Sequence, residues 1–387
     1  MSELTIAQNQ LRELVELLLG AYPRVIAPVL RQQAPAKLAD GALHGGGPGR
    51  AGESEFALLG GPEEAWFSGI NTVTSVKECF LPRSEELFLF EQWKGESDLR
   101  CHLPDEQPTV LLGVRPCDAG SLPLLDRVFL EEPTDEFWAR RRERTTVVTI
   151  GCSQSDPFCF CTAVGLAPDS PAGSDVLLLP RADGRFAVRS LTNKGQALVA
   201  RIRKLLVTTE TAPPLLAEVP TRFNLPQAQA WLAEHVEDGP WEALSFPCLG
   251  CGVCTYLCPT CSCFDIADEG KVSRGERRRN WDSCSLTLFT QQASSHNPRP
   301  ELWQRWRHRL EHKFRYFPER YGSVACTGCG RCRRFCPAGL GVEDTLVRIA
   351  PAGARSPDAG FCQTRGFSPL PTKAGTERSD AGALPKV

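Results

Sequence analysis

Two short runs of apolar residues in the first half of the chain have the length and character of buried strands. Residues 109–114 read TVLLGV and residues 145–150 read TTVVTI, and each run is followed by a turn that carries a cysteine, Cys117 or Cys152. The stretch between them, which begins AGSLPLLDRVF, has helical character. Apolar runs joined by a helical crossover are typical of a βαβ unit with parallel strands. The pattern therefore predicts an N-terminal α/β domain.

Two other stretches have the periodicity of amphipathic helices. The first follows the N-terminus, and its apolar stripe is formed by Leu11, Leu14, Val15 and Leu18. The second is WQRWRHRLEHKFRYF, and its stripe is formed by Trp303, Trp306, Leu310 and Phe314. Arg, Lys and His occupy the rest of the second helix, so we expect its apolar face to pack onto the C-terminal part of the chain.

These patterns divide the chain into four regions. An α/β domain over residues 1–210 is followed by a linker over 211–245 with a short helix near Ala228–His235. A third region, 246–350, contains an insertion at 264–322 that we expect to be helical. Residues 351–387 are rich in Pro, Gly and Ala with few large apolar residues, so we expect a disordered tail. The Gly-rich stretch 42–54 predicts a flexible loop.

Composition adds one strong signal, which is cysteine. The chain has 387 residues, 18 of them Cys, and a formal net charge of −2. A charge near zero gives no indication of nucleic-acid binding. The N-terminus lacks the features of a secretory signal, and no apolar run approaches the roughly 18–20 residues of a membrane span. A cysteine-rich chain of this kind is typical of metal binding in the cytoplasm rather than of disulfide bonding.

The cysteines are concentrated in two copies of one motif. CLGCGVCTYLCP begins at Cys248, CTGCGRCRRFCP begins at Cys326, and both read C-x2-C-x2-C-x3-C-P. This run is the ligand pattern of bacterial ferredoxins that hold [4Fe–4S] clusters. The region 246–350 is therefore predicted to be a ferredoxin-like domain with two clusters.

The fourth cysteine of each motif is expected to serve the other cluster, as it does in two-cluster ferredoxins. Glycines within each motif allow the backbone to approach the cluster closely, and the final proline turns the chain away. The first-loop set is then Cys248, Cys251, Cys254 and Cys336, and the second-loop set is Cys326, Cys329, Cys332 and Cys258.

Other metal chemistries match these motifs less well. A pair of zinc sites would use two CxxC pairs or CxxC with two histidines, whereas each run here already carries four cysteines and no nearby histidine. Cys254, Cys258 and Cys261 have the C-x3-C-x2-C spacing of radical-SAM enzymes, but the region lacks the long series of βα units that those enzymes need.

A third site is indicated in the N-terminal domain. Parallel strands place functional residues at their carboxyl ends, and Cys117 and Cys152 directly follow two such strands. The next loop, QSDPFCFCT, adds two more thiols. We expect one further [4Fe–4S] cluster at the N-terminal set, which is Cys117, Cys152, Cys159 and Cys161. Four buried thiols without a metal, or a zinc ion on the same ligands, are the alternatives.

Six cysteines and three arginine-rich stretches have no assigned role at this stage. Cys261, Cys263 and Cys284 lie close in sequence to the paired motifs. Three interpretations stay open for them: they line the cluster cavity, one of them replaces a cluster ligand, or they are packed thiols. Cys79, Cys101 and Cys362 belong to no pattern. The stretches at 140–144, 274–279 and 332–336 are typical of solvated faces, or alternatively of charge balance beside anionic clusters and docking to an acidic partner.

Several segments together resemble a known family. In chain order they are LGVRPCDAGSLPLLDRVF, the CFC pair, CLGCGVCTYLCPTCSCFDI, NWDSC, HNPRP with HKF downstream, and CTGCGRCRRFCP. They resemble the iron–sulfur beta subunit of sulfhydrogenase-type, NAD(P)-linked [NiFe] hydrogenases. The iron–sulfur subunit of anaerobic sulfite reductase, of the same dicluster group, is similar. The resemblance covers roughly residues 70–345.

The resemblance implies an electron-transfer subunit of a heteromeric enzyme. Its partners would be a flavin subunit that binds NAD(P)H and a catalytic subunit, either a [NiFe] hydrogenase or a sirohaem sulfite reductase. The chain has no P-loop, HExxH motif or nucleophile elbow, so no separate catalytic site is predicted. Two other functions stay open: an enzyme with its own active site at the N-terminal set, and a scaffold or maturation protein that delivers clusters.

Overall fold

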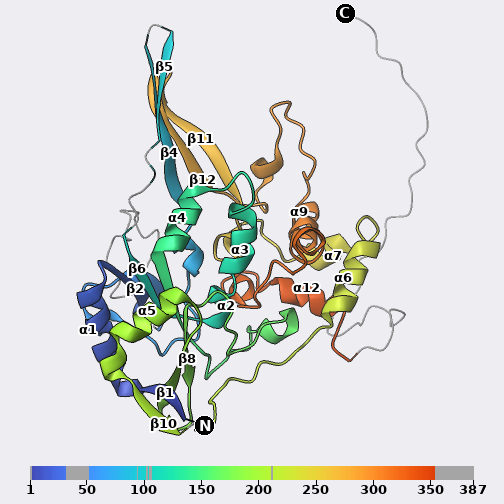
Figure 1. Ribbon diagram of the computed structural model, residues 1–387. Helices are drawn as coiled ribbons and strands as arrows, with labels where there is room; N and C mark the ends of the chain where they lie inside the picture. Colours follow the sequence, from blue (N-terminus) through green and yellow to red (C-terminus); the bar gives the residue numbers. More distant parts are fainter. Residues whose placement is uncertain are drawn as a thin grey trace, which may run out of the picture.

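The computed structural model describes residues 2–31, 52–93, 95–101, 103, 107–210 and 212–353. Most of the predicted flexible loop, most of the predicted disordered tail and Cys362 lie outside the described residues. The described residues form a large sheet, a projecting four-stranded sheet and a helical C-terminal part (Figure 1). No helix among them is both long and apolar enough to cross a membrane.

The large sheet has eight strands in the order β10-β1-β9-β8-β7-β6-β2-β3. Four central strands, β2, β6, β7 and β8, run parallel, whereas the others pair antiparallel. Their bounds are β1 Ser2–Ala7, β2 Arg24–Leu30, β3 Ser54–Leu58, β6 Thr109–Val114, β7 Thr145–Ile150, β8 Val176–Pro180, β9 Arg185–Ser190 and β10 Val207–Glu210. The predicted parallel strands are therefore confirmed.

Helices cover both faces of this sheet, which explains why its central strands are continuous apolar runs. Val110 and Leu112 of β6 pack with α1 (Leu11–Ala21) and α5 (Asn193–Arg201). Leu111 faces the opposite side. The helices on that side are α2 (Pro116–Ala119), α3 (Leu122–Phe129) and α4 (Glu136–Arg144). The predicted stripe of α1 is buried, so the N-terminal amphipathic helix is confirmed.

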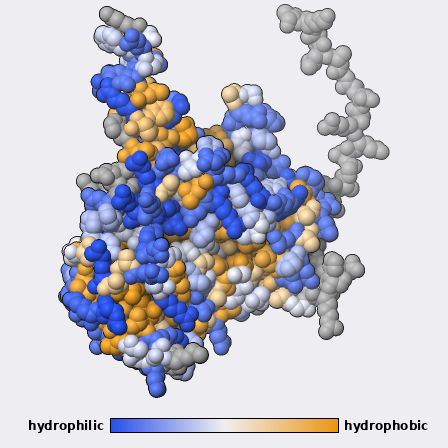
Figure 2. Space-filling view, viewed as in Figure 1, coloured by the Kyte–Doolittle hydropathy of each residue, from blue (hydrophilic) through white to orange (hydrophobic). Residues whose placement is uncertain are grey.

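A second sheet of four strands projects from the body as an arm (Figure 1). It pairs β4 (Ser84–Trp93) and β5 (Glu96–Arg100) with β11 (Phe264–Lys271) and β12 (Arg274–Trp281), in the order β11-β12-β4-β5. Hydrophobic residues gather on the arm below its tip (Figure 2). The insertion at 264–322 is thus not purely helical, because it opens with a hairpin that pairs with a strand of the N-terminal half.

The interpretation of the arginine-rich stretches as solvated faces is wrong for two of their residues. Arg279 on β12 and Arg141 on α4 are both less than a tenth exposed, and both pair with the buried Glu85 of β4. A strand rich in arginine has little sequence signal of its own, because it depends on a carboxylate from a distant strand. The arm is therefore joined to the body by buried ion pairs.

The C-terminal part is a small helical domain around the two cysteine motifs. Its helices are α6 Leu225–Glu234, α7 Trp241–Ser245, α8 Val253–Tyr256, α9 Leu302–Glu311, a π-helix His312–Tyr316, α10 Phe317–Tyr321, α11 Arg331–Arg334 and α12 Val342–Ile349. Trp306, Leu310 and Phe314 are buried in one core with Cys326 and Cys332, as expected for the predicted amphipathic helix. Short 3-10 helices lie at Gln8–Gln10, Pro62–Glu64, Val76–Cys79, Cys161–Val164, Arg203–Leu205 and Thr287–Thr290.

Candidate iron–sulfur site

The first cysteine loop is open to solvent on one side. Gly250 and Gly252 both have positive φ, which turns the backbone so that the Gly250 N–H donates to Cys248 Sγ at 3.4 Å. Burial raises the pKa of Cys248, and Cys254, Cys336 and Cys251 raise it further. Cys336, from the second motif, is therefore near Cys248 of the first loop. Cys251 is exposed.

The second cysteine loop repeats this backbone inside the protein. Gly328 and Gly330 have positive φ, and the Gly328 N–H donates to Cys326 Sγ at 3.5 Å. Burial raises the pKa of Cys326 to about 12, and the nearby Cys258 and Cys329 also raise it.

Cys332 completes this group. Burial raises its pKa to about 12 as well, with Cys329 and Cys326 among its neighbours. Cys258, from the first motif, is near Cys326 and Cys329 of the second loop.

The N-terminal cysteines converge at the carboxyl ends of β6 and β7. Cys117 lies in the first turn of α2, and burial raises its pKa far above the usual value, with Asp118, Cys329 and Cys152 adding to the effect. Burial also raises the pKa of Cys161 to about 11, and Cys152 and Cys329 contribute. Cys117, Cys152 and Cys161 are thus near one another and near the second loop.

Cys159 is oriented differently from the other three. Its thiol donates to Asp156 Oδ1 at 3.3 Å. The other oxygen of this carboxylate, Oδ2, accepts a hydrogen bond from Arg334 Nε at 2.8 Å. Burial raises its pKa to about 12, and its strongest charged neighbours are Asp156 and Arg334. The structure brings three thiols of the N-terminal set together and turns the fourth toward a carboxylate.

The second loop is packed directly against the N-terminal site. The Phe160 N–H donates to the Gly328 carbonyl at 2.9 Å. A Cβ atom at Gly328 would overlap the backbone of Cys161, and one at Gly330 would overlap the Phe158 carbonyl. The two glycines are therefore required both for their positive φ and for this close approach.

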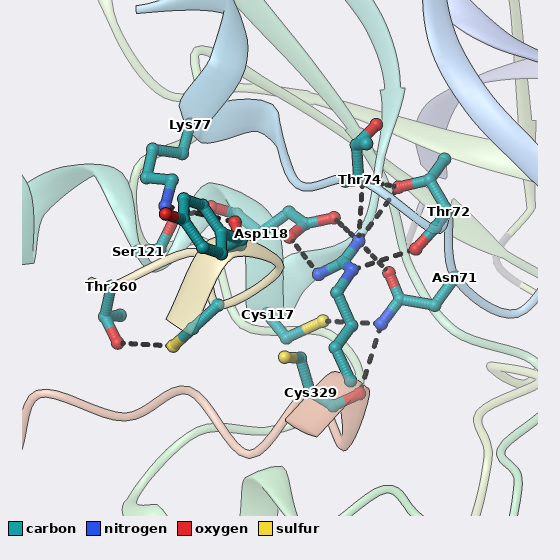
Figure 3. Close-up of polar contacts among 12 residues, drawn as sticks. Asn71, Thr72, Thr74, Lys77, Cys117, Asp118, Ser121, Thr260 and Cys329 are labelled. Carbon is teal, nitrogen blue, oxygen red and sulfur yellow. Dashed lines mark hydrogen bonds and ion pairs between the residues drawn. The ribbon is translucent and has the colours of Figure 1, made fainter. Parts of the chain in front are cut away.

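A buried ion pair reinforces the same contact (Figure 3). Arg331 and Asp118 are both fully buried and form two bonds of 2.6 and 2.7 Å. Arg331 also donates to the carbonyl of Thr72 at 2.8 Å and to Asn71 Oδ1 at 2.5 Å.

Asn71 in turn joins the two sites. Its Nδ2 lies 3.3 Å from the Cys329 carbonyl and 3.8 Å from Cys117 Sγ. Figure 3 shows the sulfurs of Cys117 and Cys329 facing the same space.

The three unassigned cysteines near the motifs also gather, at the base of the arm. The thiols of Cys263 and Cys284 are near each other, and the Cys261 thiol is near Cys258. Cys79 lies in the 3-10 helix Val76–Cys79, and Cys101 is exposed directly after β5.

Three cations are buried beside these thiols. Lys77, Arg309 and Lys313 are each 3% exposed or less, and in the described part of the chain none of them forms an ion pair with a carboxylate. A buried cation without a counter-charge is unfavourable. An anionic cluster with thiolate ligands supplies that charge, so the residues present fit such a group.

A single metal ion fits less well. Within the described ranges, no three His, Cys, Asp or Glu side chains lie close enough together to hold one ion. The ligands of a four-iron cube bind different irons, so their sulfurs are farther apart than the ligands of one ion.

Sequence reasoning did not identify the polar residues around the thiols. Lys313, Arg331, Asp118 and Asn71 all contact a cysteine or its neighbour, but only Asp118 and Arg331 are adjacent to one in sequence. The HKF segment, which contains Lys313, is singled out only because it is one of the segments that resemble the family.

Comparison with known proteins agrees with the two cysteine motifs of the C-terminal part. Residues 247–340 match the 4Fe-4S dicluster domain family. The chain is 34% identical over 246 residues to sulfhydrogenase 2 subunit beta of Pyrococcus furiosus, in an alignment that covers 59% of this chain and 70% of the relative. No solved structure matches the chain. The dicluster domain indicates at least two [4Fe–4S] clusters, and the chain belongs to the family of sulfhydrogenase beta subunits.

Proposed function

We propose that the chain is the electron-transfer subunit of a multisubunit cytoplasmic oxidoreductase and holds three [4Fe–4S] clusters. The first-loop, second-loop and N-terminal sets, as defined above, would each hold one. Such clusters supply one-electron oxidation and reduction at potentials set by their surroundings. The observation that carries the proposal is the central position of the second loop.

The second loop is connected to both other sets. On one side it exchanges cysteines with the first loop, since Cys258 lies with the second-loop thiols and Cys336 with the first. On the other side Gly328 and Arg331 hold it against the N-terminal domain. These contacts support an order of N-terminal, second-loop and first-loop sets, as a relay requires.

The first-loop set provides the exposed end of this order. Cys251 is exposed, and the neighbouring side chains of Phe246 and Leu249 are 73% and 68% exposed. Apolar residues around an exposed ligand loop suit contact with another subunit. We infer that a partner subunit docks on this loop.

The partners are inferred from the family. The relative is named as a subunit of a sulfhydrogenase. We infer a flavin subunit that binds NAD(P)H on one side and a catalytic subunit on the other, a [NiFe] hydrogenase or a sirohaem sulfite reductase. A chain with 18 cysteines, most of them proposed as cluster ligands, suits a reducing compartment, the cytoplasm.

Iron and sulfide analysis with EPR on the anaerobically purified full chain tests this function. Three cubes of four irons predict about twelve iron atoms per chain. About eight iron atoms per chain would show that the N-terminal set holds no cluster. Conversion of a substrate by the chain without partners would contradict an electron-transfer role, and transfer of clusters to an apo-protein would favour a scaffold.

A second candidate, an enzyme with its active site at the N-terminal set, is favoured by the orientation of Cys159. If Cys159 stays bonded to Asp156, one iron at that set has no cysteine ligand. Cys159→Ser then leaves the iron content unchanged and the spectrum of that cluster intact. If Cys159 is a ligand, as in the electron-transfer proposal, the variant loses or alters that cluster, whereas Cys79→Ser, the matched control, does not.

A further inference from the structure

Lys313 is a buried lysine whose ammonium group lies against a cysteine of the second-loop set. Its Nζ is 3.3 Å from Cys258 Sγ, 2.9 Å from Thr260 Oγ1 and 2.9 Å from the carbonyl of Ala325. An ammonium has three N–H donors and no acceptor. All three donors therefore have an acceptor, which is the arrangement of the charged form.

The backbone around Lys313 is specialised. Helix α9 ends at Glu311 and continues as a π-helix over His312–Tyr316. A π-helix turn inserts an extra residue into a helix and frequently occurs at functional sites. The Ala325 N–H also donates to the Lys313 carbonyl at 2.8 Å. The backbone and the side chain of Lys313 are therefore both hydrogen-bonded to Ala325, the residue before Cys326.

Within the described ranges, no cation is hydrogen-bonded to a sulfur of the first-loop set. Cys248 and Cys326 each receive one backbone N–H, at 3.4 and 3.5 Å, so the two loops are alike in that respect. Among the described residues, Lys313 is the lysine or arginine with a hydrogen bond to a sulfur of either set. Arg309 donates instead to Cys261 Sγ at 3.5 Å and to the backbone carbonyl, not the sulfur, of Cys254 at 2.7 Å. The charged donor distinguishes the second-loop set.

We propose that Lys313 is a positioning residue that raises the reduction potential of the second-loop cluster above that of the first-loop cluster. Reduction adds negative charge to a buried cluster, and a cation bonded to a ligand sulfur stabilises that charge. No carboxylate within the described ranges neutralises this ammonium. The middle of the relay then holds electrons more tightly than its exposed end. This inference rests on the proposed function.

The test is a potentiometric titration of the full chain followed by EPR, with iron content measured on each sample. Lys313→Met should lower the equilibrium constant for reduction of the second-loop cluster at least tenfold, which is about 59 mV for one electron. The signal of that cluster is identified as the one missing from Cys332→Ser. Lys313→Arg should restore most of the potential.

Arg315→Met is the matched control. Arg315 lies on the same π-helix but pairs with Glu311 and Glu319, so its loss removes a charge without touching a thiol. It should leave all potentials unchanged. If Lys313→Met does not take up iron, Lys313→Gln, which keeps a donor but not the charge, is titrated instead.

The outcomes separate the two proposals. A wild-type chain without [4Fe–4S] signals contradicts the proposed function. A fully loaded Lys313→Met or Lys313→Gln chain with wild-type potentials contradicts the role of Lys313 and leaves the proposed function intact. An equally large shift in the reduction potentials of the first-loop and second-loop clusters also contradicts the role of Lys313, because its hydrogen bond reaches a sulfur of the second-loop set alone.

Discussion

The two cysteine loops have the same spacing and the same backbone but opposite surroundings. At matched positions the first loop has Leu249, exposed Cys251 and Val253, whereas the second has Thr327, buried Cys329 and Arg331. Leu249 faces solvent, whereas Thr327 is 1% exposed. The ligand motif therefore sets the cluster type, and the residues between the cysteines decide whether a loop faces a partner or the interior.

Arg331 explains most of this difference. Its fully buried ion pair with Asp118 attaches the second loop to the domain that holds Cys117. Val253 at the matched position carries no charge, so the first loop has no such anchor. One residue within a shared motif thus helps to hold one loop inside the protein, whereas the other loop lies at its surface.

The largest effect is expected from Cys258→Ser. Because Cys258 lies with the second-loop thiols, its loss should remove the cluster of Cys326, Cys329 and Cys332, and with it about a third of the iron. Iron content and EPR check this. Cys336→Ser, the reciprocal variant, should remove the first-loop cluster instead. Loss of the signal of the Cys248 loop in Cys258→Ser would contradict the crossed sets.

The next effect is on stability and concerns the anchor. Asp118→Asn leaves Arg331 charged, buried and without its partner, which should destabilise the fold by about 3–5 kcal/mol. Urea unfolding measures it. Val253→Ala at the matched position of the first loop should cost much less. Equal losses in the free energy of unfolding for the two variants would show that this ion pair does not anchor the second loop.

A smaller effect compares one glycine in each loop. Gly328→Ala and Gly250→Ala both force a side chain into positive φ, at about 1–2 kcal/mol each. Gly328→Ala should cost more, because its Cβ also overlaps the backbone of Cys161, whereas that of Gly250 meets a flexible end of Leu302 at 3.2 Å. Thermal unfolding compares them. A larger loss for Gly250→Ala would argue against close packing of the second loop.

The smallest effect on the fold is expected from Leu249→Asp. The side chain is exposed, so the free energy of unfolding should change by less than about 0.5 kcal/mol. Electron exchange with the purified partner subunits should nevertheless slow markedly, as stopped-flow spectroscopy can measure. Leu288→Asp, at another exposed leucine, is the control. An unchanged rate for Leu249→Asp would place the docking surface elsewhere.

The sequence predicts those parts of the molecule that depend on local patterns. The parallel strands β6 and β7 are apolar runs followed by cysteines, and each cysteine motif is a short continuous segment. The arm could not be predicted, since β12 is rich in arginine and is stabilised by Glu85 from a distant strand. Lys313 lies on a predicted helix, but its inward position depends on a π-helix turn that periodicity does not indicate.

The orientation of Cys159 is another feature that could not be predicted from the sequence. Its spacing with Cys161 suggests a shared site, but the nearby Asp156 competes for its thiol. Sequence spacing shows which cysteines can meet, whereas hydrogen-bond partners from other segments decide which of them do.

The central claim is that the second-loop cluster lies between the other two. The most direct test is EPR of the fully reduced chain, in which neighbouring paramagnetic clusters split and broaden each other's signals. We predict such coupling in the wild type. In Cys332→Ser, the two remaining clusters should give narrow, uncoupled signals. Persistent coupling between the N-terminal and first-loop clusters in that variant would contradict the central position of the second loop.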